Sequence, residues 1–103
     1  MTQLERIARM ENLLNEGNSA INELLSALEK YKNAKPDIDE LIDYYSSPLW
    51  RQDFDDDAAG KLPHDLKRGV LSEDAVYDLI SERRNLMDEM AVLLHLHDTN
   101  NNY

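Results

Sequence analysis

The segment from Ile7 to Tyr31 reads IARMENLLNEGNSAINELLSALEKY and gives the strongest evidence for the fold. Its apolar positions recur alternately three and four residues apart, which is the heptad spacing of a helix that packs along one seam. The seam consists of Ile7, Met10, Leu14, Gly17, Ile21, Leu24, Leu28 and Tyr31. Leu13, Ala20, Leu25 and Ala27 flank this seam, so the apolar stripe is wide enough to face two neighbouring elements.

The ends of this helix follow from its capping signals. Thr2 precedes Glu5 by three residues, which is the spacing of a capping box at a helix N-terminus. Pro36 lacks a backbone N–H and disfavours helix interiors, so it is expected to interrupt the helix. The sequence therefore predicts a first helix over residues 2–33.

A middle helical segment is expected over residues 37–58. Asp37 and Glu40 repeat the capping spacing, and apolar residues follow at helical intervals as far as Tyr45. Ser47 and Pro48 then predict a new helix start, with the serine as N-cap and the proline in the first turn. This second part of the segment should end near Gly60.

A third helix is predicted over residues 72–97. Ser72 is a favourable N-cap, and Glu73 and Asp74 follow it where the helix dipole favours acids. Its apolar face repeats at helical spacing from Val76 to Leu94. Residues 99–103 form a polar tail, which leaves residues 1–98 as a single helical domain.

These elements predict an all-α fold, in which two long helices form an antiparallel hairpin and a short middle helix packs against them. The broad stripe in so small a chain also predicts a homodimer. Two such hairpins would pair into a four-helix core.

Composition excludes several classes of function. The chain has 103 residues with 11 Lys and Arg against 21 Asp and Glu, giving a net charge of −10. Such acidity argues against binding to nucleic acid or to an anionic membrane surface. No apolar run has the length of a transmembrane helix or a secretory signal. The sequence contains no cysteine, so we expect a cytoplasmic protein without disulfides or thiolate metal sites.

The acidic charge is concentrated in the middle of the chain. Residues 36–60 contain eight acids and one base, together with four of the seven aromatic residues. Aromatic residues beside charged ones are typical of a protein-interaction surface. The candidate partner-binding residues are Tyr44, Tyr45, Trp50, Arg51, Asp53 and Phe54. The alternative is that these rings complete a small core.

The leading hypothesis is therefore a non-enzymatic interaction or assembly module that binds a basic protein partner through residues 44–57. A second hypothesis is a metal-dependent hydrolase of phosphate compounds, because helical carboxylates can hold magnesium. Its candidate ligands are Asp37, Glu40, Asp43, Asp78 and Glu82. The Glu-x-x-Glu and Glu-x-x-Asp pattern of all-α nucleoside-triphosphate pyrophosphatases is incomplete here, so no catalytic residue and no cofactor is predicted.

Three sequence blocks also carry a family resemblance. They are Leu4-Glu-Arg-Ile7 with Met10-Glu11, then Tyr44-Tyr-Ser46 with Trp50 and Asp53, and finally Leu62-Pro63 with Leu66-Lys-Arg-Gly-Val-Leu-Ser-Glu-Asp74. Together they resemble a family of small bacterial proteins classed as a domain of unknown function. The resemblance implies a stand-alone helical cytoplasmic protein, and it supplies no catalytic or cofactor-binding residues.

Overall fold

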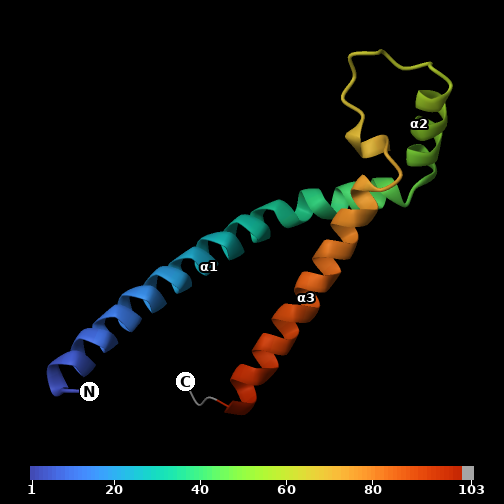
Figure 1. Ribbon diagram of the computed structural model, residues 1–103. Helices are drawn as coiled ribbons and strands as arrows, with labels where there is room; N and C mark the ends of the chain where they lie inside the picture. Colours follow the sequence, from blue (N-terminus) through green and yellow to red (C-terminus); the bar gives the residue numbers. More distant parts are fainter. Residues whose placement is uncertain (101–103) are drawn as a thin grey trace. The chain divides into compact units, whose positions relative to one another are not determined.

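The computed structural model describes residues 1–100, and helices make up all the regular secondary structure in that range. In chain order these are α1 (Gln3–Tyr45), α2 (Pro48–Ala58), the short 3-10 helix η1 (Gly69–Leu71) and α3 (Ala75–Asn100) (Figure 1). Two long helices with a short one between them confirm the predicted all-α class. The antiparallel pairing of the long helices stays a prediction.

The prediction that Pro36 ends the first helix is wrong. α1 continues through Pro36 as far as Tyr45 and absorbs the first part of the expected middle segment. The proline costs the helix one hydrogen bond, because it has no N–H to offer to the carbonyl of Lys32. Lys32 and Pro36 are both exposed, so water can satisfy that carbonyl, and the proline's fixed φ is compatible with a helix.

The start and end of α2 follow the sequence signals. Ser47 takes the extended conformation of an N-cap and Pro48 occupies the first turn, as predicted. At the other end Gly60 has a φ of +73°, which an L side chain rarely adopts. The Gly60 N–H bonds to the Asp57 carbonyl and the Lys61 N–H bonds to the Asp56 carbonyl, each at 3.0 Å. These two bonds form the Schellman arrangement that closes a helix.

α3 begins later and ends later than its predicted range of 72–97. Ser72 acts as the predicted cap, because its Oγ accepts a hydrogen bond from the Ala75 N–H at 3.1 Å. Residues 73 and 74 form a turn before the helix begins at Ala75. Thr99 and Asn100, expected in the polar tail, belong to α3, and the remaining tail residues 101–103 lie outside the described residues.

The chain divides into two units that meet within α1, after Ile38. The N-terminal unit, Met1–Ile38, is a single helix preceded by a capping box. In that box the Glu5 N–H bonds to the Thr2 Oγ1 at 3.1 Å, as predicted. The C-terminal unit begins at Asp39 and contains the buried side chains of the described range, Leu71 (6% exposed) and Val76 (3%).

A helix that crosses a membrane must be both long and apolar. Across residues 1–100, no helix combines the length and the apolar character that crossing a membrane requires.

Candidate functional site

Three aromatic rings of the C-terminal unit form one cluster, which we call the aromatic cluster: Tyr45, Trp50 and Phe54. Tyr45 ends α1, and the other two lie one turn apart on α2. The Tyr45 and Trp50 rings meet edge to face with their centroids 5.0 Å apart, and Trp50 stacks on Phe54 at 5.2 Å. All three side chains are half-buried.

The aromatic cluster is tied to η1 and to the turn before α3. The Trp50 Nε1–H donates a hydrogen bond to the Val70 carbonyl at 2.9 Å. The Tyr45 hydroxyl lies 3.5 Å from the Glu73 carbonyl, the long limit for a hydrogen bond. The buried Leu71 follows Val70 directly. These contacts are those expected of the core-packing alternative, and the use of the same residues as a partner surface stays a prediction.

Tyr44 and Asp53 form the shortest polar contact between α1 and α2. The Tyr44 hydroxyl donates to Asp53 Oδ2 at 2.6 Å. This hydrogen bond, followed by burial and by the negative charge of Asp53, raises the pKa of Tyr44 to about 12. Both residues were predicted as partner-binding candidates, and in the structure their polar groups form a hydrogen bond with each other. The connection between α1 and α2 contains a further hydrogen bond, in which the Ser47 hydroxyl donates to the Tyr44 carbonyl at 2.6 Å.

Three further acids of α2 lie beside cations of the same unit. Arg51 Nε is 3.3 Å from Asp55 Oδ1, and the Arg51 guanidinium also lies 5.5 Å from the centre of the Phe54 ring. Lys61 Nζ is 3.7 Å from Asp56 Oδ1, and Arg68 Nε is 3.0 Å from Asp57 Oδ1. An exposed pair such as Arg51–Asp55 contributes about 0.2–1 kcal/mol, and all three pairs reduce the charge that α2 offers to a basic partner.

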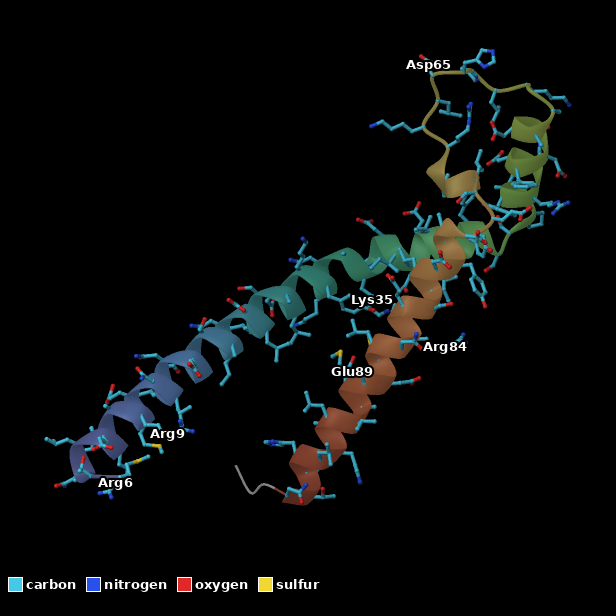
Figure 2. The ribbon with its side chains drawn as sticks, viewed as in Figure 1. Arg6, Arg9, Lys35, Asp65, Arg84 and Glu89 are labelled. Carbon is cyan, nitrogen blue, oxygen red and sulfur yellow. The ribbon has the colours of Figure 1, made fainter. Side chains whose placement is uncertain are left out.

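Arg68 holds the loop that connects α2 to η1, and its role was not foreseen from the sequence. Its Nη2–H donates to the Pro63 carbonyl at 2.6 Å, while its Nε is shielded from solvent beside Asp57. In the described part of the chain this Nε–H has ion-pair distance to Asp57 without the alignment of a hydrogen bond. In Figure 2, Asp65 is at the far end of the loop that Arg68 closes. The basic character of residues 61–71 was the available signal.

The predicted metal ligands do not form a site in the structure. Asp37 belongs to the N-terminal unit, whereas Glu40, Asp43, Asp78 and Glu82 belong to the C-terminal unit. Within residues 1–100, no group of three or more His, Asp or Glu side chains is placed to hold a metal ion. One ion pair between α1 and α3 was not predicted from the sequence. Arg83 Nη1 lies 3.2 Å from Asp39 Oδ1.

A comparison with protein-family models identifies the family of this chain. The model of a Domain of unknown function (DUF4298) matches residues 7–93. The chain belongs to this family. Membership of this family confirms the expectation of a domain of unknown function, and the matched range includes α2, η1 and most of both long helices. The searches of curated proteins and of solved structures found no match.

Proposed function

We propose that this family member is a non-enzymatic assembly module whose contact surface is the α1 seam, the eight heptad positions from Ile7 to Tyr31. What supports the proposal is the exposure of the large apolar side chains along it. Ile21 is 66% exposed and Leu24 is 62% exposed, and Ile7, Met10, Leu14 and Leu28 are 40–56% exposed. Burial of one such side chain stabilises a protein by about 1.5–3 kcal/mol, so a row of them strongly favours contact with another apolar face.

The N-terminal unit needs such a contact to be a stable helix. It is one helix of the chain, and the structure places no buried side chain in it. Long helices in proteins owe most of their stability to packing of an apolar face and little to intrinsic helix propensity. A second helix against the seam would supply that packing.

The second half of α3 offers another apolar face. Leu93 is 64% exposed and Leu94 is 62% exposed, and Leu86 and Met90 lie on the turns before them. Figure 2 marks Arg84 and Glu89, which are charged neighbours of these residues on the same helix. Apolar surface on both long helices supports assembly with another apolar face.

The acidic, aromatic segment remains the second candidate surface for the same function, with a basic protein as its partner. Its rings and four of its acids have partners within the C-terminal unit, so the surface it offers consists of other side chains. Leu49 and Gln52 are both exposed on α2. Substitution of these two residues tests whether the segment binds a partner while leaving the aromatic cluster intact. Replacement of Trp50 would disrupt that cluster.

The proposal is tested by measuring mass and helix content for two matched variants. In the seam variant, Ile21→Glu and Leu28→Glu place two charges in the seam, seven residues apart. In the control variant, Ser19→Glu and Ser26→Glu place the same charges at the same spacing on the opposite face. The seam variant should lose helix content by circular dichroism and lose any assembly seen by light scattering. The proposal is wrong if the seam and control variants behave alike.

A further inference from the structure

We infer that an apolar face of α3 is a docking surface for an amphipathic helix of another protein that carries basic residues along one edge. This surface, which we call the α3 face, consists of Leu86, Met87, Met90, Leu93 and Leu94. It lies on a different helix from the α1 seam, so the inference goes beyond the proposed function and names the chemistry of a partner.

The α3 face continues the stripe by which α3 packs into the C-terminal unit. Val76 is buried and Leu79 is half-buried, and helical spacing places both in line with Leu86. Arg83 lies on the same stripe, and its guanidinium pairs with Asp39 of the same unit. From Leu86 onward the large apolar side chains are exposed. The described part of the C-terminal unit therefore covers only the first half of this stripe.

The residues of the α3 face suit a helical partner. All five lie on one side of α3 within about two turns. Met87 and Met90 have flexible, polarisable side chains, which adapt to apolar partners of different shape. An amphipathic helix docks on such a face through apolar residues at the same helical spacing.

Acids without cations border the α3 face along one edge, which we call the acidic edge: Asp78, Glu82 and Glu89. They are four and seven residues apart, which places them on one side of the stripe. All three are exposed, and none has an ion pair within residues 1–100. Arg84 and Glu89, labelled in Figure 2, are about 140° apart around the helix, so this arginine does not neutralise the edge.

The acids of α2 differ, because each of them has a partner inside the C-terminal unit. Asp53 accepts the hydrogen bond of the Tyr44 hydroxyl. The other three form ion pairs, which are Arg51 with Asp55, Lys61 with Asp56 and Arg68 with Asp57. The negative charge that is most available to a basic partner is therefore on α3.

Charge also selects between a second copy and a basic partner. Residues 85–100 contain three acids and no Lys or Arg, so two α3 faces in contact would repel each other. A helix with an apolar stripe and lysines or arginines along one edge would cover the face and pair with the acidic edge. Glu82 and Glu89 are separated by about 10 Å along the axis, so we expect partner cations about two turns apart.

The test measures binding of a synthetic peptide to the full-length chain by fluorescence anisotropy. The probe is a labelled helix of about four turns, built from leucine and lysine with the leucines on one face. A control peptide has glutamate in place of each lysine. The lysine peptide should bind about tenfold more tightly or better, and added salt should weaken it. Absence of binding, or equal binding of the two peptides, overturns the inference.

Two pairs of neighbouring residues provide matched variants. Leu93 lies on the α3 face and is 64% exposed, whereas Val92 lies off it and is 60% exposed. Leu93→Gln should weaken binding of the lysine peptide about tenfold, and Val92→Gln should leave it unchanged. Glu89→Gln should weaken binding several-fold and reduce its salt dependence, whereas Asp88→Asn, on the opposite side of α3, should not. Equal effects within either pair contradict the assigned surface.

A second copy of the chain on the α3 face would give a different result. The chain alone would then form a dimer by light scattering, and Leu93→Gln would dissociate it while Val92→Gln would not. That outcome overturns the basic partner.

The seam variant separates this inference from the proposed function. If it binds the lysine peptide more tightly than its control variant, the seam covers the α3 face and the docking surface is wrong. If it loses the peptide while Leu93→Gln retains it, the peptide binds the seam, which overturns the inference and supports the proposed function. Binding that Leu93→Gln and Glu89→Gln weaken, and that the seam variant leaves unchanged, supports the inference whatever the outcome for the seam.

Discussion

The indole Nε1–H of Trp50 donates a hydrogen bond to the Val70 carbonyl at 2.9 Å, across twenty residues of sequence. This bond joins the first turn of α2 to η1, and the Trp50 ring at the same time contacts Tyr45 and Phe54. Trp50 therefore contacts the end of α1, α2 and η1 at the same time.

Replacing Trp50 should lower the stability of the C-terminal unit in two steps. Trp50→Phe keeps a ring but leaves the Val70 carbonyl without its donor, which should lower the free energy of unfolding by about 1 kcal/mol. Trp50→Ala also removes the ring contacts and should cost more. Urea unfolding followed by circular dichroism measures both. Leu49→Ala, at an exposed neighbouring position, is the control and should change stability little.

Ionisation of Tyr44 should destabilise the fold at high pH. Its pKa is raised from 10.0 to about 12 in the folded state, chiefly by the hydrogen bond to Asp53. The stabilisation is therefore fully present below pH 10 and is lost as the pH rises towards 12. Unfolding curves across that range should show the loss. Tyr44→Phe, which has no hydroxyl to ionise, should lack this part of the pH dependence, and an identical pH profile for both proteins would contradict the assignment.

Arg68 should protect the loop between α2 and η1 from proteolysis. Arg68→Ala removes the bond to the Pro63 carbonyl and the ion pair with Asp57, so the loop should open more often. Trypsin should then cleave faster after Lys61 and Lys67, as measured by mass spectrometry of the fragments. Arg51→Ala removes an exposed ion pair within α2 and should leave these rates unchanged. Unaltered cleavage in Arg68→Ala would show that the loop is held by other contacts.

Ser72 should stabilise the start of α3 through its side-chain oxygen. Ser72→Ala removes the acceptor of the Ala75 N–H and should lower stability by about 1 kcal/mol. Ser72→Thr keeps the oxygen and should restore most of that loss. Hydrogen exchange at the Ala75 amide reports the same bond directly. If the Ala and Thr variants exchanged at equal rates, the cap would not be the source of the protection.

Local signals in the sequence predicted the caps at which the helices begin. The capping box of Thr2 and Glu5, the Ser47–Pro48 start and the Ser72 cap each depend on residues three positions apart or fewer. The structure confirms the capping bonds of Thr2 and Ser72, which form within a single turn, and at Ser47 it confirms the extended N-cap conformation with Pro48 in the first turn. The 3.5-residue spacing of the seam likewise predicted a long helix before any contact was known.

The effect of Pro36 on α1 and the pairing of the acids in residues 44–57 could not be predicted from the local sequence pattern. A proline removes one hydrogen bond wherever it stands, but whether the helix ends there depends on the solvation of the freed carbonyl and on what the flanking turns contact. In the same way, the clustering of rings and acids in residues 44–57 was visible in the sequence. Which acid would bind a cation and which would bind Tyr44 was not visible.

The helical class, the caps and the heptad seam of α1 follow from the sequence, since each is set by residues within one or two turns of one another. The bond of Trp50 to Val70, the bond of Arg68 to Pro63 and the pairing of Arg83 with Asp39 are known from the folded structure alone. Trp50–Val70 and Arg83–Asp39 join residues far apart in the chain, and Arg68–Pro63 spans an irregular loop. Their geometry depends on the path of the chain between the partners, which no local periodicity specifies.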